Sequence, residues 1–462
     1  MRSERRPPLL LLSALGLSVG LLAAFLLSAP RVVAVQPAPS MEGARALASI
    51  SIEFSQSMRE ETVESRLRLA PSRPGTFRWA GRRVTFTPSQ SWASGTTVEV
   101  VLEAGALSRR GLPVLVPTRW SFTVGAGRLA YLWPSDGPAA LYAWSEASAE
   151  PERLATAPLG ILDFSVTSDG SAIVYAAATP DGTEIRRLSL DGEGGELLHR
   201  CPADSVCRRP TLSPDGDLLA YVREDRPADG SMLRRVWMQA VGGDSAYPVA
   251  PEDHATSQPA WSSQGWLAVY DHTLAAYALY DVVSAEAARL AFVVPNGLGE
   301  PPAWSPNGEW LVFAEIVFLT ETATDDESPP RFYSHLKRVA IEDGQVVDLS
   351  GDETMLVEDS GPAYAPDAAW IAFARRSLAP TEWTIGRQLW LVRPDGSQGT
   401  RLTAVAEMNH GGIAWSPDSS RLAYIVFDQT EPTEPAELWW RWSDGREGGL
   451  VAIGGYAPAW IP

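Results

Sequence analysis

Two cysteines are the residues of this sequence whose type and spacing point most directly to chemistry. Cys201 and Cys207 enclose five residues in the segment CPADSVC. Two thiols at this spacing can close a small disulfide loop in an oxidising compartment, or they can remain free. A structural metal site would need more ligands close in sequence, and His199 is the only one nearby. We therefore predict a disulfide, with free thiols and a metal site as the alternatives.

The histidines could act as general bases or metal ligands, because imidazole is neutral near pH 7. They are widely separated along the chain. We interpret them as surface or turn residues, with convergence of two of them at one site as the alternative. They are His199, His254, His272, His335 and His410.

Motifs for covalent or metal-assisted catalysis are missing from the sequence. The segment GLSVG, Gly16 to Gly20, matches the GxSxG pattern, but it lies in an apolar stretch where no strand–turn–helix elbow is expected. The sequence has no HExxH, P-loop or EF-hand pattern. We therefore predict that the protein is not an enzyme, that it needs no cofactor, and that it has no catalytic, metal-binding or cofactor-binding residue.

Some carboxylates fall in turns and others in a long acidic segment. Turn residues such as Asp215, Asp367 and Asp418 recur at one position of a repeat, which favours a role in closing turns. The segment ETATDDESPP contains Asp325, Asp326 and Glu327. It reads as a projecting loop, either solvated or in contact with a partner or a cation, and we keep these three residues as a candidate partner loop.

The charge balance excludes one class of partner. The chain has 38 Lys and Arg residues against 56 Asp and Glu residues, a formal charge of −18. Phosphate backbones attract basic surfaces, so we predict no binding of nucleic acid.

The N-terminus has the pattern of a membrane anchor. Arg2, Arg5 and Arg6 precede an uncharged stretch from Leu9 to Ala29, which is long enough to cross a bilayer as a helix of about 20 residues. Basic residues stay on the cytoplasmic side, so the rest of the chain should be exported. We predict a single-pass protein of the cell membrane, with residues 1–36 as stub, anchor and spacer. The alternative is a signal peptide cleaved after Ala34, which would leave a secreted or periplasmic protein.

Residues 37–125 predict a small β-sandwich. Segments such as ISIEFSQSM alternate apolar and polar positions, and Gly, Pro and Ser clusters separate them. The region resembles the bacterial immunoglobulin-like domain of surface-layer and other envelope proteins. The resemblance rests on Phe54-Ser55 with Met58, Gly75 to Phe77, Val84 to Pro88, Gly95-Thr96, and Trp120 to Phe122. It implies a spacer or adhesive module.

Residues 126–462 contain a repeated motif. PTLSPDGDLLAYVR, PAWSSQGWLAVYD, PAWSPNGEWLVFAE, PAYAPDAAWIAFAR and IAWSPDSSRLAYIV start at Pro210, Pro259, Pro302, Pro362 and Ile413, and a degenerate copy starts at Phe164. Repeats of roughly 40–50 residues made of short strands are typical of a β-propeller. We expect an aromatic ring at the end of each inner strand to fill the space between neighbouring sheets. These rings are Trp261, Trp304, Tyr364, Trp415 and Trp460.

The two ends of this region complement each other. Residues 127–156 predict three strands without the motif strand, and the C-terminal PAWIP, 458–462, is a motif strand with nothing after it. Together they would complete one blade and close the ring. We therefore predict an all-β protein with a seven-bladed propeller, with six and eight blades as alternatives.

The repeat resembles that of the TolB-type propellers, which share a PxWSPDG segment followed by an IAF- or LAY-like strand. TolB is a periplasmic envelope protein that binds a peptidoglycan-associated lipoprotein, but its N-terminal domain is α/β, and an anchor and an immunoglobulin-like module stand there in this chain. The resemblance implies the architecture and identifies no contact residue.

We predict a membrane-anchored extracytoplasmic binding or scaffold protein whose propeller engages a protein or glycan of the envelope. One alternative is a propeller lyase or glycosidase acting on envelope polysaccharide. Another is a structural assembly module.

Overall fold

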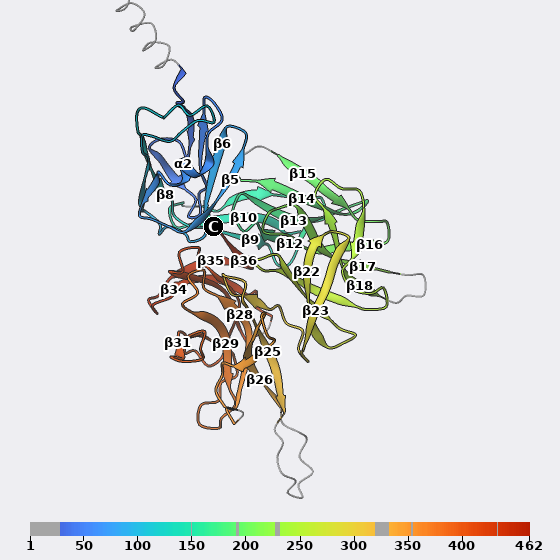
Figure 1. Ribbon diagram of the computed structural model, residues 1–462. Coiled ribbons are helices and arrows are strands. Elements are labelled where there is room, and N and C mark those ends of the chain that lie inside the picture. Colours follow the sequence, from blue (N-terminus) through green and yellow to red (C-terminus); the bar gives the residue numbers. More distant parts are fainter. Residues whose placement is uncertain are drawn as a thin grey trace, which may run out of the picture. The chain divides into compact units, whose positions relative to one another are not determined.

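The computed structural model describes residues 28–148, 150–190, 194–226, 232–318, 332–352, 354–431 and 433–462. Most of the predicted anchor and the candidate partner loop Asp325–Glu327 lie outside these residues. Within the described ranges, no helix is both long enough and apolar enough to cross a membrane. The chain forms two compact units, Met1–Gly125 and Ala126–Pro462 (Figure 1).

The first unit is a β-sandwich. One sheet has the strand order β1-β3-β6-β5 and the other the order β2-β8-β7-β4. In β3 the side chains alternate between buried and half-buried, as the sequence predicts. Trp92 packs edge-on against Phe122 in the core, with ring centroids 5.8 Å apart. The elements are β1 (Val32–Gln36), β2 (Met41–Ala44), β3 (Ile50–Phe54), α2 (Glu60–Glu64), β4 (Leu67–Ala70), β5 (Gly75–Ala80), β6 (Arg83–Pro88), β7 (Thr97–Leu102) and β8 (Thr118–Val124).

The second unit is built from antiparallel groups of four strands. Consecutive strands form the sheets β12–β15, β16–β19, β20–β23 and β32–β35. Strands β24–β27 and β28–β31 form two similar groups, joined into one larger sheet by a single parallel pair between Ser334 and Glu358. The strands of the first half are β9 (Arg128–Trp133), β10 (Ala140–Ser145), β11 (Glu152–Ala155), β12 (Ile161–Val166), β13 (Ala172–Thr179), β14 (Gly182–Ser189), β15 (Gly195–Arg200), β16 (Ser205–Leu212), β17 (Leu218–Asp225), β18 (Leu233–Ala240), β19 (Ala246–Pro248), β20 (Thr256–Trp261), β21 (Trp266–Asp271), β22 (Ala276–Ser284) and β23 (Ala287–Pro295). Those of the second half are β24 (Ala303–Trp304), β25 (Trp310–Phe318), β26 (Phe332–Ala340), β27 (Val346–Asp348), β28 (Val357–Tyr364), β29 (Ile371–Ser377), β30 (Gln388–Val392), β31 (Thr400–Arg401), β32 (Met408–Trp415), β33 (Arg421–Asp428), β34 (Glu437–Trp442), β35 (Gly449–Ile453) and β36 (Tyr456–Ile461).

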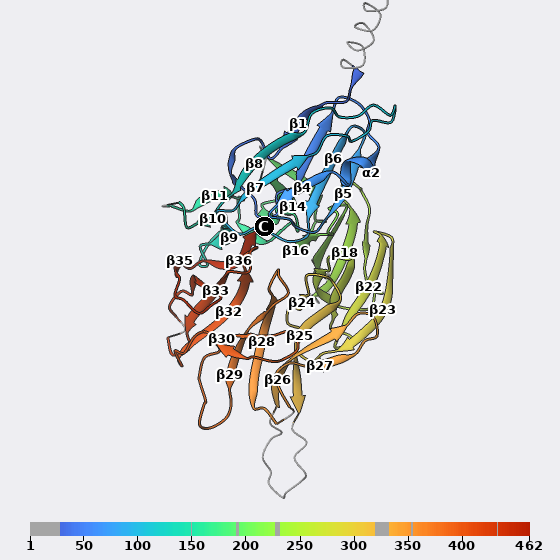
Figure 2. The same cartoon turned by 60° about the vertical axis from the view of Figure 1, so that its left-hand side comes forward.

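One end strand of each sheet lies toward the middle of a ring: the first strand of six groups, and β36, the last strand of the chain, in the sheet β11-β10-β9-β36 (Figure 2). We call β12, β16, β20, β24, β28, β32 and β36 the inner strands. Each contacts the next in this order, and β36 contacts β12 again. This closed arrangement of radial sheets is that of a β-propeller.

The last sheet joins the two ends of the unit. Its strand order is β11-β10-β9-β36, so the C-terminal strand completes a sheet that begins with residues 128–133. Trp460 pairs with Leu129 and Ile461 with Arg128. The pairing covers the strand edge that β9 would otherwise expose.

Ser-Pro-Asp turns connect two of the inner strands, β16 and β32, to the next strand of their sheets. Ser213 Oγ donates to Asp215 Oδ1 (2.6 Å) and accepts the backbone N–H of Leu218 (2.9 Å). Ser416 and Asp418 form the equivalent pair at 2.7 Å. The interpretation of these aspartates as turn residues is therefore confirmed.

The repeat aromatics lie between sheets. The indole N–H of Trp304 donates to the carbonyl oxygen of Ala260 on the preceding inner strand (2.9 Å), and Trp415 donates likewise to Ala363 (2.9 Å). Each ring belongs to an apolar cluster that includes residues of the preceding sheet. The rings are Trp261, Trp304, Tyr364, Trp415 and Trp460.

Two histidines correct the sequence interpretation. His335 and His410 are 0% and 5% exposed, so neither is a surface residue. His335 Nδ1 lies 2.8 Å from Asp348 Oδ2, and its Nε2 lies 2.8 Å from the carbonyl oxygen of Met355. Both partners accept hydrogen bonds when Asp348 is ionised, so the arrangement favours the protonated imidazolium form of His335 over the neutral ring.

We expect His335 to make stability depend on pH. Burial alone would lower its pKa, but the hydrogen bonds from its ring to Asp348 and Met355 outweigh burial and raise the pKa. A raised folded-state pKa gives a contribution that is complete below about pH 6.5, the unfolded value, and is lost as pH rises through the folded value. In thermal melts, the difference in melting temperature between the wild type and His335→Gln should shrink from pH 6 toward alkaline pH. A difference that stays constant or grows would contradict this.

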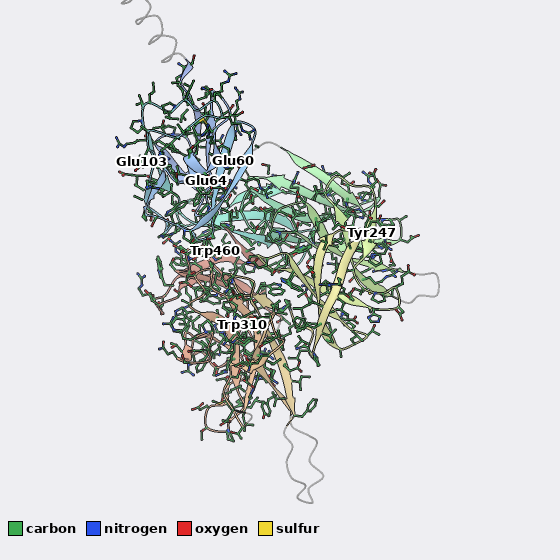
Figure 3. All side chains as sticks on the ribbon, viewed as in Figure 1. Glu60, Glu64, Glu103, Tyr247, Trp310 and Trp460 are labelled. Carbon is green, nitrogen blue, oxygen red and sulfur yellow. A yellow bond between two sulfur atoms is a disulfide. The ribbon has the colours of Figure 1, made fainter. Side chains whose placement is uncertain are left out.

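Trp460 should be essential for closure of the ring. It is 5% exposed and belongs to an apolar cluster with Tyr131 of its own sheet and Leu438 of the preceding one. Figure 3 marks the position of Trp460. Trp460→Ala should lower the free energy of unfolding by about 3–5 kcal/mol, because it removes a large buried side chain. Trp383→Ala is the matched control, since Trp383 is 57% exposed and should change little. Equal denaturant midpoints for the two variants would refute the role of Trp460.

Candidate functional site

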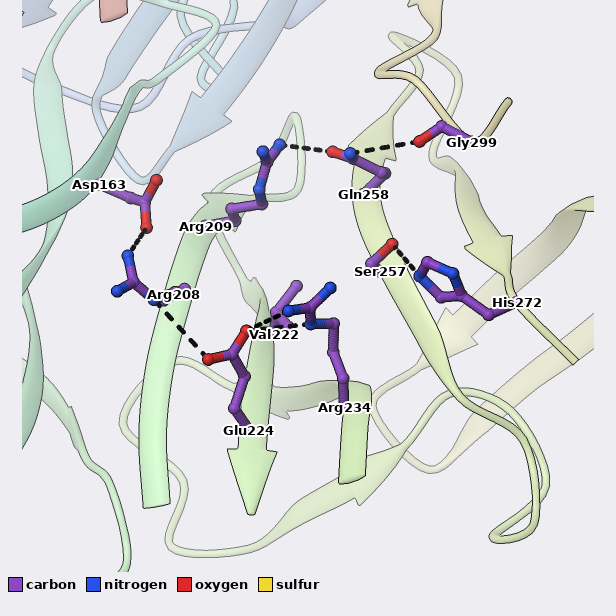
Figure 4. Close-up of a pocket in the computed structure, with 10 residues that line it drawn as sticks. All are labelled: Asp163, Arg208, Arg209, Val222, Glu224, Arg234, Ser257, Gln258, His272 and Gly299. Carbon is purple, nitrogen blue, oxygen red and sulfur yellow. Dashed lines mark hydrogen bonds and ion pairs between the residues drawn. The ribbon is translucent and has the colours of Figure 1, made fainter. Parts of the chain in front are cut away.

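A polar pocket lies where the inner strands β12, β16 and β20 approach one another (Figure 4). Its volume is about 400 Å³, within the usual range of about 300–1,000 Å³ for small-molecule sites. We call it the inner-strand pocket. It is lined by Asp163, Arg208, Arg209, Val222, Glu224, Arg234, Ser257, Gln258, His272 and Gly299.

A chain of ion pairs runs along one wall of the pocket. Arg208 lies between Asp163 (3.5 Å) and Glu224 (3.8 Å). Arg234 donates to Glu224 Oε1 at 2.9 Å. Burial raises the pKa of the Asp163 carboxyl, and the charges of Arg208 and Arg209 act against this rise. Two arginines and two carboxylates therefore neutralise each other on this wall.

Arg209 and Gln258 form the rim between two neighbouring sheets. The guanidinium of Arg209 donates to the side-chain oxygen of Gln258, whose amide donates to the carbonyl oxygen of Gly299 (3.4 Å). Arg209 is exposed. Among the residues that the structure describes, no carboxylate forms an ion pair with Arg209 within 4 Å.

Both rim residues sit on β-bulges with left-handed backbone. Arg209 has φ +49° and Gln258 φ +56°. The same position of the repeat holds Gly361 (φ +58°) and Gly412 (φ +57°), where the conformation is free of strain, and Ala457 (φ +51°). A residue with a Cβ in this conformation costs about 1–2 kcal/mol relative to the right-handed one. The bulge belongs to the repeat, while the side chains placed on it differ from sheet to sheet.

The opposite wall offers neutral hydrogen-bonding groups. Ser257 Oγ lies 2.8 Å from His272 Nε2. Burial, and then the charge of Arg234, lower the pKa of His272. His272 is therefore neutral near pH 7 and can exchange a hydrogen bond with Ser257 or with a ligand.

The balance of charge in the pocket is positive. Arg208, Arg209 and Arg234 face two carboxylates, so one cation is in excess, in a chain whose formal charge is −18. An exposed guanidinium with a fork of N–H donors suits an oxyanion such as a carboxylate. The arrangement can bind an anion and donate to or accept from hydroxyl groups beside it.

The other residues singled out from the sequence lie elsewhere. Cys201 and Cys207 form a disulfide with their Cα atoms 6.0 Å apart, so the free-thiol and metal alternatives do not apply to the structure. Of the histidines, His272 alone is among the residues lining the inner-strand pocket, and the convergence of two histidines there is not observed in the described part of the chain. His199 bonds the Tyr221 hydroxyl (3.1 Å), and His254 bonds Asp271.

Sequence reasoning missed the residues of the pocket. Arg209 and Gln258 directly precede the repeat prolines Pro210 and Pro259, and Arg208 and Ser257 stand one position earlier. The residue that precedes the motif proline differs from copy to copy, although the motif itself is regular, and this variation was the available sequence signal. At this position Arg209 and Gln258 place polar side chains on the bulge, whereas Gly361 in another copy places none.

Comparisons with known proteins identify a family for the first unit. Residues 28–124 match the family described as the bacterial Ig-like domain, which confirms that part of the sequence prediction. A curated relative, the "Uncharacterized peptidase YuxL" of Bacillus subtilis (strain 168), is 23% identical over 193 residues, 36% of this chain. The chain spans 29% of that relative's length.

Solved structures of TolB proteins are among the similar folds. The putative TolB from Agrobacterium tumefaciens has a TM-score of 0.39 at 18% identity, covering 72% of this chain and 92% of the other. TolB from Acinetobacter baumannii has a TM-score of 0.44 at 12% identity, covering 94% and 99%. The structural neighbours are thus TolB-like propeller proteins, as the repeat motif predicted.

Proposed function

We propose that this chain is an exported, membrane-attached binding protein whose seven-bladed propeller holds a ligand in the inner-strand pocket. The single observation that carries this proposal is the pocket itself. A cavity of about 400 Å³ lined by charged and polar side chains has on its rim an exposed arginine, Arg209, that forms no ion pair within 4 Å among the described residues. Such a site is suited to binding, because its donors are already positioned and solvent-accessible.

The blade count rests on the inner strands. Their sequence of contacts, from β12 through β16, β20, β24, β28 and β32 to β36 and back, supports seven blades. The larger sheet counts as two blades, because a single residue pair joins its halves.

Export is supported by the disulfide and by the N-terminal sequence. Disulfides persist in oxidising compartments outside the cytoplasm. Arg2, Arg5 and Arg6 before the apolar stretch Leu9–Ala29 favour retention of the N-terminus inside the cell. The immunoglobulin-like domain would then act as a spacer between the membrane and the propeller.

A second candidate function is hydrolysis through Ser257 and His272. Their 2.8 Å contact is that of a nucleophile and its base. A triad also needs a carboxylate to orient the imidazole. The neighbouring Asp271 instead bonds His254 and accepts the backbone N–H groups of Thr273 (2.9 Å) and Leu274 (3.1 Å). The geometry therefore favours binding over acyl transfer.

Site-specific crosslinking in intact cells tests the binding function. A photoreactive side chain at Arg234, which lines the pocket, should yield a discrete adduct in the membrane fraction. The same side chain at Arg289 should not, although Arg289 is also paired with a carboxylate, because it lies on β23 away from the pocket. Identical adduct patterns at the two positions would reject the pocket as the binding site. If a fluorophosphonate labels Ser257 and the Ser257→Ala variant is not labelled, the function is hydrolysis and the binding proposal is rejected.

A further inference from the structure

We infer that the inner-strand pocket takes an acidic sugar unit, with the ligand carboxylate on Arg209 and its hydroxyl groups on Ser257, Gln258 and His272. This inference rests on the proposed function, since it names the ligand class for the same pocket. It depends on three features of the pocket: an exposed arginine that forms no ion pair within 4 Å among the described residues, a polar lining and the strained backbone of the rim.

The cation requires an anionic ligand. Glu224 is paired with both Arg208 and Arg234, and Asp163 with Arg208. The guanidinium of Arg209 contacts the neutral amide of Gln258. A ligand carboxylate is the natural partner for the remaining N–H donors, because a charge-assisted pair is about twice as strong as a neutral hydrogen bond.

The lining favours hydroxyl groups over apolar side chains. Val222 is the apolar member of the pocket, and it is 2% exposed. The other groups are a hydroxyl, an amide, an imidazole, a carbonyl oxygen and charged side chains, which both donate and accept. A peptide held by its C-terminal carboxylate would find Val222 as the one apolar side chain among the lining residues, and Val222 is almost fully buried. A sugar acid presents a carboxylate next to several hydroxyls and fits this set of partners.

The backbone of the rim indicates that its side chains have a use. Arg209 and Gln258 occupy a left-handed position that glycine fills without strain in two other copies. Strained residues are enriched at binding sites, where the surrounding structure holds them in place. Ala457 shows that the bulge alone tolerates a Cβ, so it provides a matched control outside the pocket.

Titration calorimetry on the full chain in detergent tests the inference with sodium glucuronate as the probe. Glucuronate should bind at least about tenfold more tightly than glucose, which has the hydroxyls without the carboxylate. Arg209→Gln should lower the affinity for glucuronate to that for glucose. Glutamine is chosen because Gln258 already adopts this backbone conformation. Ala457→Gly should leave both affinities unchanged.

Three results would overturn the inference. They are equal affinities for glucuronate and glucose, an unchanged affinity in Arg209→Gln, and tight binding of an acetylated tripeptide with a free C-terminus in place of glucuronate. Arg209→Gly separates binding from folding, because it should abolish glucuronate binding without lowering the melting temperature. If glucuronate fails while crosslinking at Arg234 remains specific, the ligand class is wrong and the binding function stands.

Discussion

The pairing of β36 with β9 is the constraint on which the rest of the second unit depends. The chain leaves the first sheet after three strands and supplies the fourth only at its C-terminus. Until that strand pairs, the sheets of the ring form an open series with two exposed edges, which is an unfavourable arrangement for strands. Closure fixes the neighbours of every inner strand. The inner-strand pocket exists because three of these strands are held side by side.

Closure also explains how a strongly acidic chain can present a positive site. The carboxylates on the pocket wall form ion pairs with Arg208 and Arg234. Arg209 lies on the bulge of β16, and its guanidinium donates to the amide oxygen of Gln258 on the adjacent sheet. Excess negative charge favours solubility and repels anions from acidic surface, so the proposed anionic ligand would be attracted to the inner-strand pocket, where arginines outnumber carboxylates.

The regular features of the structure could be predicted from the sequence, and the site could not. Proline, an aromatic residue and the turn after them recur because the sheets need similar packing and similar turns. The strands, the shared last sheet and the roles of Asp215 and Asp418 could therefore be predicted from the sequence. The disulfide partners were also readable, because Cys201 and Cys207 had no competitors. Arg209 and Gln258 were not predicted as site residues because they occupy the position that varies between copies of the motif. Their proximity also depends on bulges in two different sheets. The burial of His335 was not predicted, because the groups that bond its ring, Asp348 and the carbonyl oxygen of Met355, are 13 and 20 residues away in the sequence.

The central claim is that the C-terminal strand is an integral inner strand of a closed ring, and amide hydrogen exchange tests it most directly. The measurement compares the amides of Trp460 and Ile461 on β36 with those of Thr211 and Leu212 on β16. If the ring is closed as described, both pairs should exchange slowly and through the same global opening. Rapid exchange of Trp460 and Ile461, with Thr211 and Leu212 still protected, would contradict the account.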